Sequence, residues 1–191
     1  DILDIGCFAG GLLDLFRKEG ANVFGIELQK EAVEIASQKL SGCIYQADLH
    51  SDQFPQGPFD IITLTGVIEH VIEPLGLVSR IFELLKPRGV MNFAEPIMLN
   101  PQILLIKKIK WIGQMFGESP DETAFVRWQL KRRLEGIGFT DVQITPFDWL
   151  HPITPKPLIS LVETMGSVAE KLPFLREFSG SLHIRAYRPE S

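Results

Sequence analysis

The sequence predicts an α/β fold of the doubly wound kind, in which a mostly parallel sheet of seven strands carries helices on both faces. Short apolar, β-branched runs alternate along the chain with longer segments whose apolar residues recur at helical spacing. A glycine-rich turn, residues 6–11, joins the first apolar run to the first helical segment. Strands that alternate with helices are joined by right-handed crossovers and are therefore parallel. We expect the ligand beyond the carboxyl ends of these strands.

The first half of the chain supplies five strands and the helices between them. Apolar runs and the glycine that ends the first helix set the expected boundaries. Strands are predicted at about 1–6, 22–28, 43–49, 59–67 and 90–96, and helices at 12–20, at 30–40 and through Val78, Ile81 and Leu85 to the LKPRG segment.

The second half is more varied. Helices are predicted at 101–116, 124–139 and 157–172, and two late strands at 140–150 and 179–189. The segments 101–116 and 157–172 are amphipathic, the second with Leu158, Val162, Met165, Ala169 and Leu172 at helical spacing, and core packing is the simplest interpretation of both. We also expect helical insertions at about 97–118 and 150–179, placed to cover a substrate.

Length and composition favour one globular domain over residues 1–191, because 191 residues with 45% hydrophobic content can bury a sizeable core. The sequence begins inside a strand without Met, so we expect residues upstream of Asp1 to be missing. No uncharged apolar run reaches eighteen residues, and no membrane-spanning helix or signal peptide is predicted.

The charge pattern argues against a general nucleic-acid binder, since the formal net charge is -5. Residues 1–100 carry 14 acidic and 7 basic side chains, whereas residues 101–191 carry 10 and 12. The basic side chains at 127 and 131–133 are expected on a solvated helix face. Cys7 and Cys43 lack metal-site spacing, so two reduced, partly buried thiols and a cytoplasmic location are expected.

The glycine turn does not match a dinucleotide-binding loop. Its sequence is Gly6-Cys-Phe-Ala-Gly10-Gly11, and the GxGxxG spacing fails at Phe8. A bulky side chain at this position is compatible with a cofactor that has no phosphates, provided that it turns aside. We expect Phe8 to adopt a negative φ.

At this turn the chain resembles the class I S-adenosylmethionine-dependent methyltransferases. LDIGCFAG stands where these enzymes usually have LDIGCGTG, and Phe8 replaces the middle glycine. The resemblance extends from Asp1 to about residue 139, and it implies an antiparallel last strand. It also implies that Asp4, Gly6, Cys7, Phe8 and Gly10 belong to the site for S-adenosylmethionine.

Two acidic residues follow at expected strand ends. Glu27 ends the second strand, where a carboxylate can accept hydrogen bonds from both ribose hydroxyls. Asp48 ends the third, where turn chemistry is the alternative explanation. The resemblance implies that Asp48 and Leu49 bind the adenine end, and that Leu28 lies beside the adenine.

The most specific segment is FDIITLTGVIEHVIEP, residues 59–74, followed by LKPRG. It is similar to the fourth-strand motif of small-molecule methyltransferases related to quinone-biosynthesis enzymes. By this resemblance Thr65 and Gly66 face the methionine portion of the cofactor. His70 lies near the expected methyl-transfer point and is either a general base or a structural residue at a helix start. Some relatives bind a metal through ExxEH, but position 66 is Gly, so no metal is predicted.

The sequence thus predicts methyl transfer to a small, apolar or amphiphilic acceptor, such as a quinone precursor or a lipid-like molecule taken from a membrane surface. The acceptor, the attacking atom and the oligomeric state stay open. Two alternatives are kept, a nicotinamide-dependent oxidoreductase and an inactive methyltransferase-like partner protein.

Overall fold

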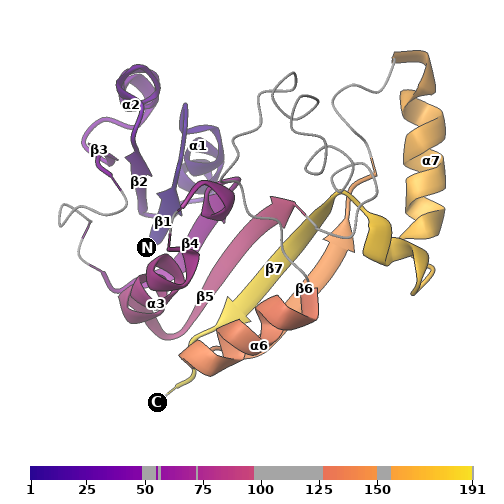
Figure 1. The fold of residues 1–191 in the computed structure, drawn as a ribbon. Helices are drawn as coiled ribbons and strands as arrows, with labels where there is room; N and C mark the ends of the chain where they lie inside the picture. Colours follow the sequence, from indigo (N-terminus) through magenta and orange to yellow (C-terminus); the bar gives the residue numbers. More distant parts are fainter. Residues whose placement is uncertain (49–54, 56, 72, 97–126, 150–155, 191) are drawn as a thin grey trace.

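A computed structural model describes residues 1–48, 55, 57–71, 73–96, 127–149 and 156–190 of the chain (Figure 1). Its centre is a seven-stranded sheet with the order β3-β2-β1-β4-β5-β7-β6. The strands are β1 (Ile2–Ile5), β2 (Val23–Glu27), β3 (Ile44–Gln46), β4 (Phe59–Thr65), β5 (Leu85–Pro96), β6 (Thr140–Phe147) and β7 (Ser181–Tyr187).

Strands β1 to β5 pair in parallel, and β7 runs antiparallel to both β5 and β6. The predicted doubly wound sheet with an antiparallel last strand is therefore confirmed. The chain steps outward from β1 to β3 and then returns to β4 on the other side of β1. This reversal leaves a crevice at the carboxyl ends of β1, β2 and β4.

Helices cover both faces of this sheet (Figure 1). Their buried apolar residues face the sheet, and in two of them these recur at helical spacing: Leu77, Val78 and Ile81 in one and Leu130 and Leu134 in another. The covering helices in the described part of the chain are α1 (Gly11–Lys18), α2 (Lys30–Lys39), α3 (Pro74–Leu84) and α6 (Arg127–Ile137).

Two predicted boundaries need correction around β4 and β5. Leu85 was expected in a helix, but α3 ends at Leu84, and Leu85 is fully buried as the first residue of β5. Leu85 pairs with Phe59 of β4. The register between β4 and β5 then shifts, and from Ile61 and Val90 onward the two strands pair regularly. His70 does not start the next long helix. It ends the 3₁₀ turn η1 (Ile68–His70), and α3 begins later, with Pro74 at its first position.

The C-terminal helical segment departs from the expected core packing. It comprises η2 (Lys156–Leu158), α7 (Ile159–Ala169) and η3 (Leu175–Phe178), and α7 stands beyond the β6 edge of the sheet (Figure 1). Its buried residue is Gly166, where an added Cβ would lie 2.9 Å from Trp149 Cβ.

The apolar side chains of this segment instead face outward. Leu161 and Met165 are 55% and 63% exposed. The exposed apolar set is Leu158, Leu161, Met165, Val168, Leu172, Phe174 and Leu175. The other predicted amphipathic segment, 101–116, lies outside the described residues. Among the described residues, no helix combines the length and the hydropathy needed to cross a membrane.

A buried polar pair joins β1 to β4. Asp4 and Thr63 are register partners, and the Thr63 hydroxyl donates a 2.7 Å hydrogen bond to Asp4 Oδ1. Burial raises the pKa of Asp4 from 3.8 to about 6. The hydrogen bond from Thr63 lowers this pKa and the nearby Glu27 carboxylate raises it, each by less than burial does. The ionised carboxylate is therefore destabilised by the folded structure.

We expect Asp4→Asn to stabilise the protein by about 1–3 kcal/mol at pH 8, because it removes this buried charge. In the unfolded chain Asp4 loses its proton near its ordinary pKa of 3.8, whereas in the folded state it does so near 6. The penalty therefore grows between about pH 4 and 6, and it is nearly absent below that window. Urea unfolding at pH 8 and pH 4 measures the difference.

Asp14→Asn is the matched control, because Lys18 and Arg17 lower the pKa of the partly exposed Asp14. That variant should not be stabilised at pH 8. An Asp4→Asn protein no more stable than the wild type at pH 8 would contradict the assignment of a costly buried charge.

Candidate active site

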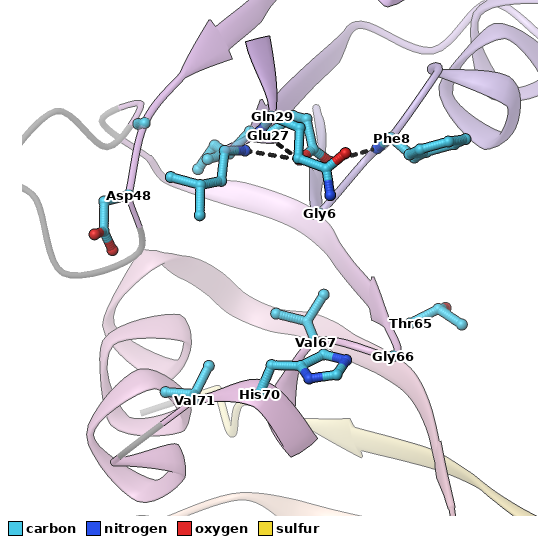
Figure 2. Close-up of a pocket in the computed structure, with 13 residues that line it drawn as sticks. Gly6, Phe8, Glu27, Gln29, Asp48, Thr65, Gly66, Val67, His70 and Val71 are labelled. Carbon is cyan, nitrogen blue, oxygen red and sulfur yellow. Dashed lines mark hydrogen bonds between the residues drawn. The ribbon is translucent and has the colours of Figure 1, made fainter. Parts of the chain in front are cut away.

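A cleft of about 580 Å³ lies at the carboxyl ends of the central strands, within the range of small-molecule sites. Figure 2 shows it with Glu27 and Gln29 on one side and Val67 and His70 on the other. Its lining residues come from β2, β4 and the segments that follow β1, β2, β3 and β4: Gly6, Phe8, Ile26, Glu27, Leu28, Gln29, Ala47, Asp48, Thr65, Gly66, Val67, His70 and Val71.

The turn after β1 closely approaches the segment that follows β4. Gly6 has a φ of +72°, and a Cβ on it would lie 2.5 Å from Val67 Cγ2. Only glycine fits this position without displacing Val67. The Gly10 amide then donates a 2.9 Å hydrogen bond to the Cys7 carbonyl, which closes the turn before α1.

Phe8 does not adopt the expected negative φ. Its φ is +46°, and it is the first central residue of the turn that the Gly10–Cys7 hydrogen bond closes; a positive φ at this position is found in the mirror-image turn types I′ and II′. The prediction was wrong because it considered the side chain and ignored the turn. The ring is 64% exposed and points away from Glu27 (Figure 2), so the cleft stays open.

Glu27 connects the turn to the end of β2. Its Oε2 accepts a 2.9 Å hydrogen bond from the Phe8 amide. Its Oε1 accepts bonds of 2.8 and 2.9 Å from the amides of Leu28 and Gln29. The carboxylate is thus held at the cleft wall, and Oε2, which accepts a single bond here, keeps lone-pair capacity for a donor from a ligand.

One end of the cleft combines an exposed acid with apolar surface. Asp48 lies there (Figure 2), and Leu28, which is 64% exposed, also lines the cleft. Sequence reasoning missed five lining residues, namely Ile26, Gln29, Ala47, Val67 and Val71. Each is close in sequence to a predicted residue. Including all residues near the predicted carboxyl ends of the strands would therefore have identified them. Leu49 lies outside the described residues.

The opposite wall carries Thr65, Gly66 and His70. The Gly66 amide donates to the Ala94 carbonyl at 3.2 Å, and the Ile68 amide donates to Glu95 Oε1 at 3.0 Å. Both bonds tie the segment after β4 to β5. They position the exposed His70 imidazole in the cleft, where it can exchange protons with a ligand (Figure 2).

Three residues expected from the resemblance lie outside the cleft lining. Asp4 and Cys7 are buried beneath it, and Gly10 closes the turn behind Phe8. Burial, with the nearby Asp4 and Glu27 carboxylates, raises the pKa of Cys7 to about 12. Cys7 and Cys43 are free thiols, as expected.

The electrostatics of the cleft favour a cation. Its lining residues include the carboxylates of Glu27 and Asp48, and this described set contains no Lys or Arg. A dinucleotide pyrophosphate would therefore meet negative charge without a basic partner. A cofactor with a positive charge fits better.

Comparison with known proteins supports the same conclusion. Residues 1–144 match the model of a family described as a methyltransferase domain. Ubiquinone biosynthesis O-methyltransferases are among the similar curated proteins. That of Actinobacillus pleuropneumoniae is 33% identical over 132 residues, covering 63% of this chain and 56% of the relative. That of Aliivibrio fischeri is 30% identical over 100 residues, covering 49% and 42%. The chain thus spans about half the length of these curated relatives.

Solved structures share the fold. A SAM-dependent methyltransferase from Archaeoglobus fulgidus aligns with a TM-score of 0.68 and 21% identity, covering 98% of this chain and 85% of that chain. A methyltransferase from Mesorhizobium loti aligns with a TM-score of 0.70 and 19% identity, covering 98% and 90%. With the family match over residues 1–144, these findings confirm the predicted resemblance: the chain belongs to the methyltransferase-domain family, among the class I S-adenosylmethionine-dependent methyltransferases.

Proposed function

We propose that this domain transfers the methyl group of S-adenosylmethionine to a hydroxyl group of a small amphiphilic acceptor of the quinone-precursor type. The observation that carries the proposal is the Glu27 carboxylate, held by three backbone amides in the middle of an acidic cleft. A fixed carboxylate at the end of the second strand suits two adjacent ribose hydroxyls.

The residues present fit this cofactor. The cleft has room for it, and the close approach at Gly6 leaves backbone rather than side chain at the wall. In the proposal Glu27 binds the ribose, Asp48 and Leu28 the adenine, and the turn from Gly6 with Thr65 and Gly66 the methionine portion. Asp4, Cys7 and Gly10 support the turn from behind, and the resemblance also assigns Leu49, which lies outside the described residues, to the adenine end. When bound, the cofactor supplies an electrophilic methyl group on a positively charged sulfur.

The chain itself contributes placement and a proton acceptor. His70 in the opposite wall removes the proton of the acceptor hydroxyl as the oxygen gains the methyl group, and releases it to solvent afterwards. Glu95, through Ile68, and Ala94, through Gly66, hold this wall in place. Alignment of the reactants in the cleft supplies much of the remaining rate.

The acceptor class is proposed from two observations. The relatives named above are ubiquinone biosynthesis O-methyltransferases, and an exposed apolar surface runs along α7. We propose that the insertions at about 97–118 and 150–179 guide an amphiphilic acceptor to the cleft of a single domain, 1–191. The enzyme would act from the cytoplasm on an acceptor taken from a membrane surface.

The alternatives receive less support. A nicotinamide-dependent oxidoreductase would need a pyrophosphate beside the cleft carboxylates. An inactive partner protein would be favoured by a Phe8 ring that filled the cleft, whereas the ring points away from Glu27 (Figure 2).

Glu27→Ala should weaken the binding of S-adenosylhomocysteine by about 1.5–3 kcal/mol, since it removes hydrogen bonds to a charged group. Isothermal titration calorimetry measures the loss. Glu27→Gln keeps one acceptor oxygen for the backbone and checks that the turn still folds. Glu34→Ala, an exposed acid on α2, is the matched control and should bind normally. Unchanged affinity in a folded Glu27→Ala protein would remove the ribose assignment.

His70→Ala should lower the rate of catechol O-methylation roughly 10²- to 10⁴-fold while S-adenosylhomocysteine affinity stays the same, because only the proton acceptor is lost. Turnover with an alkyl-substituted catechol, followed by mass spectrometry, measures the rate. His183→Ala, an exposed histidine on β7, is the control. Full activity of the His70→Ala protein would contradict the assignment of His70 as the general base and leave it a structural role.

The α7 surface should bring the protein to anionic membranes, because its exposed leucine and methionine side chains can enter the lipid interface. Flotation with vesicles of phosphatidylglycerol and phosphatidylcholine measures binding. Leu161→Glu and Met165→Glu should reduce the floated fraction several-fold, whereas Ser160→Glu adds the same charge without removing apolar surface. Wild-type protein that stays unbound even at low salt would exclude a membrane-derived acceptor.

A further inference from the structure

Phe8 combines a strained backbone with an uncovered ring. A φ of +46° is unusual for a bulky residue, and it is strained relative to glycine. Gly6 and Gly10, on either side, also have positive φ values, so the loop places its one large side chain where glycine would be easier. A strained residue of this kind needs an explanation outside its own turn.

Local structure explains the backbone of Phe8 but not its ring. The bond from the Phe8 amide to Glu27 and the closed turn hold the main chain, and glycine could make both. The ring belongs to neither buried apolar cluster found among the described residues, and it is 64% exposed at the cleft. Core packing therefore does not account for a phenylalanine at this position.

The position of Phe8 at one end of the cleft indicates which part of a ligand lies nearest to it. Phe8 and Thr65 lie toward one end and Asp48 lies at the other, with Glu27 between them (Figure 2). In the proposed function Asp48 takes the adenine and Glu27 the ribose. The remaining end, beside Phe8, is left for the methionine portion with its charged sulfur.

An aromatic ring at that end has a specific chemical use. Its face attracts a cation that approaches within about 6 Å, and the attraction is absent for a neutral group of similar shape. We infer that the Phe8 ring recognises the positive charge of the sulfonium, so that the cleft prefers S-adenosylmethionine to its neutral product S-adenosylhomocysteine. This inference rests on the proposed function and adds a residue that favours product exchange.

The test compares charged and neutral ligands in matched Phe8 variants. Calorimetry with S-adenosylmethionine, S-adenosylhomocysteine and sinefungin, which carries an amine in place of the methylated sulfur, gives three affinities for each protein. Phe8→Tyr keeps the ring. Phe8→Leu keeps apolar volume and the strained backbone but has no ring. Phe8→Gly removes both ring and strain.

We expect Phe8→Leu and Phe8→Gly to lose about 3- to 30-fold of the preference for the two cationic ligands over S-adenosylhomocysteine. Phe8→Tyr should retain it. Phe8→Gly should bind S-adenosylhomocysteine as well as the wild type or slightly better, because its turn is unstrained. An unchanged preference in Phe8→Leu that still binds S-adenosylhomocysteine overturns the inference alone. A wild-type protein that binds none of the three ligands overturns the proposed function instead.

Discussion

The Glu27 carboxylate is the interaction on which the site depends. It ends β2, it is only 8% exposed, and it accepts hydrogen bonds from the backbone amides of two separate segments. One of these segments is the turn after β1, and the other begins the connection to α2. A buried carboxylate is stable only with such donors, and these donors would otherwise need other partners. Glu27 therefore holds the turn after β1 against the residues that follow β2. It also helps to hold Phe8 in a backbone conformation that phenylalanine does not favour on its own.

Buried acids recur at the carboxyl ends of the strands. Asp4 near the end of β1 and Glu95 near the end of β5 are 6% and 1% exposed. Asp4 accepts a hydrogen bond from the Thr63 hydroxyl, and Glu95 accepts one from the Ile68 amide. Burial of acids costs stability, so their gathering here is better explained by the site than by the fold. The cleft above them is lined by Glu27 and Asp48, and its described lining has no Lys or Arg.

Much of this architecture was predictable because periodicity and glycine position determine it locally. The strands and helices expected within the described residues are present, and Gly6, Glu27, Asp48 and His70 meet in one cleft as the strand ends suggested. The positive φ of Phe8 was not predictable from its side chain, because it belongs to the conformation of the whole turn between Cys7 and Gly10. The outward-facing side chains of α7 were also missed, since a helical pattern reveals an apolar stripe but not whether another element covers it.

The geometry of the cleft follows from the position of β1 between its two walls. Asp4 is in register with Gly25 on β2 and with Thr63 on β4. A Cβ at Gly25 would lie 2.7 Å from Cys7 Sγ, so the turn after β1 can pack down only onto glycine. The Glu27 wall is thereby tied to β2 and the turn, while the His70 wall is tied to β5 through Glu95 and Ala94. Because the two walls have separate anchors in one continuous sheet, strand register sets the spacing between the Glu27 wall and the His70 wall.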